Sequence, residues 1–171
     1  MNNEVKKYIN SLDISEEDKR DFYNFSIRKD YLSRLMSKLI KETNQKVSFG
    51  YGNYNSKICF IFDTKEYESD MEDMVFNFLK SLNIDRYSIY ITYVDKAKDY
   101  NKKYELLANE LNAIRPKIIY YFGEGNLDEL NRIYSQITEV PKEYIIPKDT
   151  FNKSKKKLND MIKYKDILRR N

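Results

Sequence analysis

Ser88-Ile-Tyr-Ile-Thr-Tyr-Val94 and Arg115-Pro-Lys-Ile-Ile-Tyr-Tyr-Phe-Gly123 are the two segments that decide the fold of this chain. Both are rich in β-branched and aromatic residues, which is typical of buried strands. Between them, Tyr104 to Ile114 carries apolar residues at helical spacing. A strand, a helix and a second strand in close succession predict a βαβ unit, and therefore a parallel sheet covered by helices.

The segments around this unit continue the same pattern. Lys57 to Phe62 is an unbroken apolar run, as in a parallel strand that is buried on both faces. We expect a helix over Met71 to Leu82, a short fourth strand over Glu143 to Ile146, and a basic C-terminal helix over Phe151 to Leu168. The pattern predicts an α/β fold of three layers, α/β/α, around a central four-stranded and mainly parallel sheet.

The N-terminal forty residues have a helical pattern. Ser15-Glu-Glu-Asp18 fits a capping box, and the apolar stripe that follows, which includes Ile27, Tyr31, Leu35 and Leu39, ends near Glu42 to Asn44. No linker or repeat divides the chain. We therefore expect a single domain over 1–171, with an N-terminal helical segment at 1–45 and an α/β core at 47–168.

The composition excludes several kinds of chemistry. The 171 residues include no histidine, which removes the catalytic triads that depend on imidazole and the commonest metal ligand. A single cysteine, Cys59, excludes internal disulfides and a cysteine-ligated cluster, so no metal or cofactor is expected. No apolar run is long enough for a membrane helix and no signal peptide precedes the fold, which favours a cytoplasmic protein without membrane contact. The net charge of +4 permits a polyanionic partner but does not require one.

Several stretches agree in order and spacing with one known family. Phe49-Gly-Tyr-Gly-Asn-Tyr-Asn-Ser-Lys-Ile-Cys-Phe-Ile61 is similar to that family's FGEGNPNAKIMFV segment. Phe78 to Thr92 resembles its LLAAIGLDREDVYIT segment, and Leu107 to Gly123 resembles its L..EI..LRPKVIVALG segment. The family is the uracil-DNA glycosylase superfamily, in particular its bacterial and archaeal iron-sulfur branch. The resemblance covers roughly 49–125 and implies a uracil-DNA glycosylase-like fold.

The motifs with which this family performs its chemistry are degenerate here. Phe62-Asp63-Thr64-Lys65-Glu66 stands at the place of the GEAPG motif, so Asp63 alone lies near the position of the acid that activates water. The resemblance makes Asp63 the candidate catalytic residue, with capping of the following turn as the alternative. Thr92-Tyr93-Val94 replaces the TNV motif, and the Tyr93 hydroxyl cannot reproduce the paired donor and acceptor of an asparagine. Of the late HPS motif only Pro147 remains.

The resemblance places Phe62, Tyr93 and Pro147 around the base pocket, whereas the cysteines of the iron-sulfur cluster are absent. A second group of candidates comes from basic residues that alternate with aromatic ones, a pattern that suits backbone contact and stacking with nucleic acid. The candidate nucleic-acid-binding residues are Lys96, Lys98, Tyr100, Lys102, Lys103, Lys148, Lys155 and Lys156. The alternative is that these lysines form an ordinary solvated surface.

Three functions remain open from the sequence. The first is a glycosylase-like protein with lost or much weakened catalysis, acting as a nucleic-acid-binding or assembly module in the DNA metabolism of a phage, a mobile element or an AT-rich bacterium. The second is an active but divergent DNA glycosylase or nucleotide hydrolase that uses Asp63. The third is a structural component that binds a protein partner without DNA contact. Because several catalytic contributors are missing, the sequence favours a protein that is not an efficient enzyme.

Overall fold

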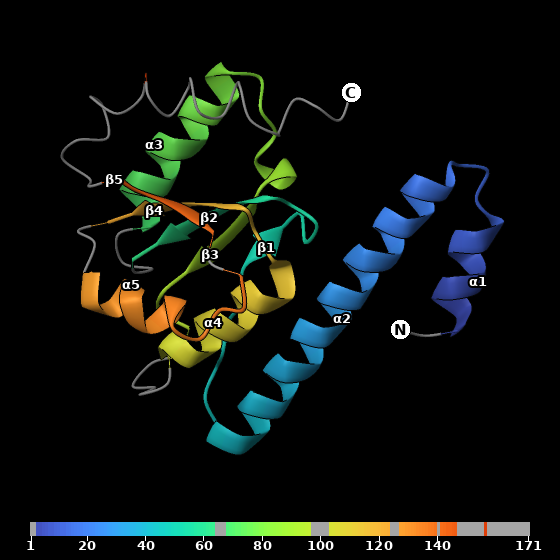
Figure 1. The fold of residues 1–171 in the computed structure, drawn as a ribbon, viewed down its shortest axis with the longest axis horizontal. Coiled ribbons are helices and arrows are strands. Elements are labelled where there is room, and N and C mark those ends of the chain that lie inside the picture. The colour runs from blue at the N-terminus through green and yellow to red at the C-terminus, as the bar shows by residue number, and fades with distance from the viewer. Residues whose placement is uncertain are drawn as a thin grey trace.

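The computed structural model describes residues 3–63, 68–96, 103–123, 127–139, 141–146 and Lys156, and these residues form an α/β fold (Figure 1). In chain order its elements are α1 (Asn3–Ser11), α2 (Glu16–Thr43), β1 (Tyr51–Gly52), β2 (Ile58–Phe62), α3 (Glu68–Ser81), the 3-10 turn η1 (Arg86–Ser88), β3 (Tyr90–Tyr93), α4 (Lys103–Ile114), β4 (Ile118–Phe122), α5 (Leu127–Tyr134) and β5 (Lys142–Ile146). The expected α/β class is confirmed.

The described strands form one five-stranded sheet in the order β1-β3-β2-β4-β5. Strands β2, β3, β4 and β5 are parallel, whereas the two-residue β1 pairs antiparallel with β3. The βαβ unit β3-α4-β4 is therefore present, with β2 inserted between its two strands. The sheet has one strand more than the four expected. The additional strand is β1, which was not predicted because the glycines around Tyr51 and Gly52 indicate a turn rather than a strand.

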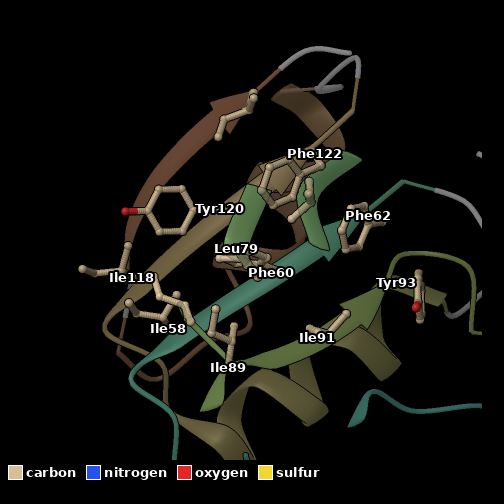
Figure 2. Packing of buried hydrophobic residues seen from close by; sticks show 13 residues of the cluster. Ile58, Phe60, Phe62, Leu79, Ile89, Ile91, Tyr93, Ile118, Tyr120 and Phe122 are labelled. Atoms are coloured by element: carbon tan, nitrogen blue, oxygen red, sulfur yellow. The ribbon is translucent and has the colours of Figure 1, made fainter. Parts of the chain in front are cut away.

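Alternate side chains of each parallel strand face opposite layers. Ile58, Phe60 and Phe62 of β2 pack on the face covered by α3, which contributes Val75 and Leu79 (Figure 2). On the other face, buried strand residues pack against side chains of α4, α5 and α2; these strand residues are Cys59, Ile61, Tyr90, Ile119 and Tyr121. Burial on both faces explains why the strand sequences are apolar without alternation.

The N-terminal helices lie to one side of the sheet and form a hairpin in which α1 packs on α2 (Figure 1). Helix α2 begins as expected, because the Ser15 side chain accepts a hydrogen bond from the Asp18 backbone N–H, and it ends at the left-handed Asn44. Its apolar stripe is only partly buried. Leu39 packs in the core, but Ile27 and Tyr31 are about half exposed, at 51% and 47%. These two side chains are therefore not closed over by the rest of the structure that is described.

The other boundaries agree with the sequence pattern to within a few residues. The expected C-terminal helix over Phe151 to Leu168 lies outside the described residues, apart from the helical Lys156. Among the helices that are described, none has the length and apolarity needed to span a bilayer.

Candidate functional site

Asp63 lies at the carboxyl edge of the sheet, directly after β2, where open α/β sheets bind ligands. Its backbone N–H donates to the Phe122 carbonyl (3.3 Å), and its carboxylate accepts a hydrogen bond from the Tyr121 hydroxyl of the neighbouring strand. A Cβ added to Gly123 would overlap the same carboxylate, so the glycine at this strand end makes room for Asp63. The carboxylate is thus held against the sheet by its own neighbours.

Phe62 and Tyr93, both assigned to a base pocket from the sequence, are packed side chains. The Phe62 ring lies between Phe122 and Tyr93 (Figure 2), stacked on Phe122 with centroids 5.0 Å apart and tilted against Tyr93 at 5.9 Å. Phe62 is 2% exposed and Tyr93 is 7% exposed. These rings fill the carboxyl end of the face that α3 covers, so neither presents a free aromatic surface to a base.

Glu72 of α3 anchors this aromatic group. Its Oε1 accepts hydrogen bonds from the Tyr93 hydroxyl (3.1 Å) and from the Tyr51 hydroxyl (2.6 Å). Burial, followed by the hydrogen bond to Glu72, raises the pKa of Tyr51 to about 12. Position 93, where the resemblance implies a base-reading asparagine, therefore connects β3 to α3.

Lys96 was expected to contact nucleic acid, and the structure contradicts this. Its side chain is fully buried and forms an ion pair with the equally buried Glu110 of α4. Its Nζ also donates to the Thr92 hydroxyl and lies 5.7 Å from the centroid of the Phe49 ring. Because burial of an unpaired ammonium is very costly, the partner on α4 is what holds Lys96 inside.

Glu110 collects several further donors. Its Oε1 accepts from the Gly50 backbone N–H (2.5 Å) and the Tyr90 hydroxyl (2.6 Å), and its Oε2 accepts from the Thr92 hydroxyl (2.9 Å). Burial and the nearby carboxylate raise the pKa of Tyr90 well above its ordinary value. The network joins β3, α4 and the segment before β1. These polar groups therefore stabilise the packing of the three segments.

Of the other residues predicted to contact a base or nucleic acid, the structure describes only two. Lys103 begins α4 and its Nζ lies 3.5 Å from an Asp95 carboxylate oxygen. Lys156 is exposed. Pro147, Lys98, Tyr100, Lys102, Lys148 and Lys155 lie outside the described residues.

Sequence reasoning missed Glu110, although a signal for it exists. Glu110 follows Leu106 by four residues and Leu107 by three, and precedes Ile114 by four. A carboxylate on the apolar stripe of a helix indicates a buried partner, because a lone buried charge is unstable. Among the described residues, no cluster of three or more acidic or cysteine side chains suited to a metal ion is present.

Comparison of the chain with protein-family models and with curated protein sequences found no match.

Proposed function

We propose that this protein is a uracil-DNA glycosylase-like domain in which base excision is lost or much weakened, and that it serves as a nucleic-acid-binding or assembly module in DNA metabolism. The observation that carries the proposal is the contact between Asp63 and Tyr121. The one acidic residue near the family's catalytic position is used as a hydrogen-bond acceptor within the sheet.

The sheet supports the resemblance. The strands that begin near Lys57 and Ser88 pair in parallel, with Cys59 opposite Tyr90 and Phe62 opposite Tyr93. Antiparallel pairing of these two segments would have been incompatible with a glycosylase-like scaffold. Parallel pairing is shared by other doubly wound α/β folds, so it supports the fold assignment without identifying the activity.

The packing at the carboxyl edge supports weakened catalysis. Base excision requires a flipped base in a shaped pocket, read along its edge and stabilised as its bond breaks. Here the Phe62 ring packs between Tyr93 and Phe122, and both Phe62 and Tyr93 are buried among the described residues. Each preorganised electrostatic contact that is lost costs about a hundredfold to a thousandfold in rate, so the loss of several leaves little turnover.

Two assays on the full chain test the proposal. In the first, uracil-containing and otherwise deaminated oligonucleotides are incubated with the protein and with Asp63→Asn, and base release is measured. We expect no enzymatic release from either protein. Robust release that Asp63→Asn abolishes would contradict the loss of catalysis and favour an active divergent glycosylase. In the second, binding to single-stranded and duplex DNA is titrated with salt, and salt-sensitive binding is expected.

A protein-binding role is the second candidate, and the helical hairpin is the observation that favours it. Tyr8 of α1 and Phe22 of α2 are 66% and 51% exposed. Aromatic residues are enriched in the surfaces through which proteins bind one another. Co-purification of a specific protein partner, together with an absence of DNA affinity, would favour this function over the first.

A further inference from the structure

A groove of about 450 Å³ lies between α2 and α4, away from the carboxyl edge. Arg115 lines it and lies three residues before β4, so the groove opens near the amino ends of the strands, whereas Asp63 follows β2 at their carboxyl ends. The lining residues are Asn24, Ile27, Arg28, Tyr31, Asn109, Asn112, Ala113 and Arg115. This volume is in the range of pockets that accept small organic ligands.

The groove has two cationic side chains in its lining, while Asp21 and Glu139 lie near enough to interact with Arg28 and Arg115 respectively. The lining residues that the structure describes include the two arginines and no acidic side chain. Burial and, second, repulsion by Arg115 lower the pKa of Arg28, while Asp21 opposes this effect. Two guanidinium groups that repel each other across one groove provide a site where an anion is stabilised by both.

A hydrogen bond orients the Arg28 side chain, and the end of α4 fixes the backbone at Arg115. Arg28 Nη1 donates to the Tyr54 carbonyl (2.9 Å), which orients the guanidinium and leaves its other N–H groups for a ligand. Arg115 has φ +55° and its N–H donates to the Leu111 carbonyl (2.7 Å), so it ends α4 in the left-handed conformation. Its side chain is exposed at this end of α4.

The same groove has an apolar wall and amide groups. Ile27 and Tyr31 lie one helical turn apart on α2 and expose about half of their surface. Asn112 is already used, because its amide donates to the Gln136 carbonyl and accepts from the Thr138 N–H, both at 2.9 Å. Asn24 and Asn109 add amide groups to the lining. Guanidinium groups beside an exposed aromatic ring are the combination that binds the phosphate and the base of an unpaired nucleotide.

We propose that this groove binds one nucleotide of a single-stranded nucleic acid, with the phosphodiester on Arg28 and Arg115 and the base against Tyr31. The inference rests on the nucleic-acid-binding part of the proposed function and names the site of that binding. A single strand fits better than a duplex, because stacking on Tyr31 needs a base face that the neighbouring base pairs of a duplex would cover, and because the volume suits one nucleotide.

The test is fluorescence anisotropy of a labelled oligothymidylate with the full chain over a range of salt concentrations. We expect Arg115→Gln to weaken binding at least about tenfold and to lower the salt slope by about one phosphate contact. Tyr31→Ala should weaken binding by about fivefold or more with an unchanged salt slope, because it removes stacking and not charge. Arg28→Lys keeps the charge but loses the planar fork, so it should weaken binding while retaining most of the slope.

Arg34→Gln is the matched control, since Arg34 is an exposed arginine outside the groove, on the helix α2 that carries Arg28 and Tyr31. It should bind almost as the wild type does, and circular dichroism should show that every variant is folded. If the wild type binds and Arg115→Gln and Tyr31→Ala bind equally well, the groove assignment is wrong and the proposed function stands. If the wild type binds no single strand under low salt, the groove assignment fails, and the nucleic-acid part of the proposed function fails with it only when duplex DNA is not bound either.

Discussion

The Lys96 ammonium and the Glu110 carboxylate form an ion pair in which neither side chain is accessible to solvent. The pair connects the chain just after β3 to the middle of α4, and Glu110 also receives the Gly50 N–H from the segment that precedes β1. A lysine expected on a nucleic-acid-binding surface is therefore part of the core of the protein.

Replacing one member of this pair should destabilise the fold strongly. Glu110→Gln leaves the Lys96 ammonium buried without a counter-charge, and the expected cost is about 3–5 kcal/mol in the free energy of unfolding. Urea denaturation followed by circular dichroism measures it. Glu139→Gln is the matched control, because Glu139 makes an exposed ion pair with Lys117 (2.7 Å) that water screens. An equal, small effect of both substitutions would contradict the proposed role of the buried pair.

Removing both charges should restore part of the lost stability. In Lys96→Met combined with Glu110→Gln, no buried charge remains, and the glutamine Oε1 still accepts a hydrogen bond from the network. The double variant should therefore be more stable than Glu110→Gln alone. A double-mutant cycle from the same urea experiments measures the coupling, and additive single effects would show that Lys96 and Glu110 do not act as a pair.

The fold could be predicted from the sequence further than the site could. Apolar runs such as Ile58–Phe62 and the helical spacing of 103–114 identify the parallel sheet, because burial on both faces leaves little choice of residue. The two-residue β1 gave no such signal. Its pairing depends on contact with β3, and Gly52 at φ +102° is typical of a turn as well.

The site depends on contacts between distant segments, which one sequence does not reveal. Tyr121 reads as an ordinary strand aromatic, and its bond to Asp63 follows only from the register in which Ile61 lies beside Tyr121. Likewise, Arg28 and Arg115 are 87 residues apart and meet in a groove only because α2 packs against α4. Lys96 was misassigned because a lysine in a charged segment is normally exposed.

Stability should fall at alkaline pH. Burial is the main cause that raises the pKa of five tyrosines, namely Tyr51, Tyr54, Tyr90, Tyr120 and Tyr134. Their pKa in the unfolded chain is about 10, so above that pH the unfolded state loses protons that the folded state keeps. The stabilisation is complete below about pH 10 and is lost as the pH rises through the folded values, which for Tyr51 is about 12.

Urea denaturation at a series of pH values from 8 to 11, with tyrosinate absorbance recorded in parallel, measures this dependence. The unfolding free energy should decline across the upper part of the range, and part of the tyrosinate signal should appear only together with unfolding. A constant free energy over the whole range would show that the buried hydroxyls do not resist ionisation.

The thiol of Cys59 should be inert in the folded protein. The residue is the second of β2 and is completely buried, and burial raises the pKa of the thiol well above its ordinary value. Because the thiolate is the reactive form, a disulfide reagent should label the native protein only at the rate at which the fold opens. Labelling in urea is the positive control. Rapid labelling of the native protein would mean that the sheet opens locally at β2.

The contact between Asp63 and Tyr121 can be tested independently of any substrate. Tyr121→Phe removes the donor, keeps the ring, and should lower the free energy of unfolding by about 1.5–3 kcal/mol, the usual contribution of a hydrogen bond to a charged group. Asp63→Asn should lower the free energy of unfolding by a similar amount. If Asp63 and Tyr121 act as a pair, the double variant is only slightly less stable than either single variant. Tyr120→Phe is the matched control. Tyr120 precedes Tyr121 in the same strand, but its side chain faces the layer on the opposite side of the sheet. Tyr121→Phe also removes one hydrogen-bond donor from Asp63, so base release by this variant can be measured beside the wild type. Release by the variant but not by the wild type would show that Tyr121, rather than the loss of the family's motifs, suppresses catalysis.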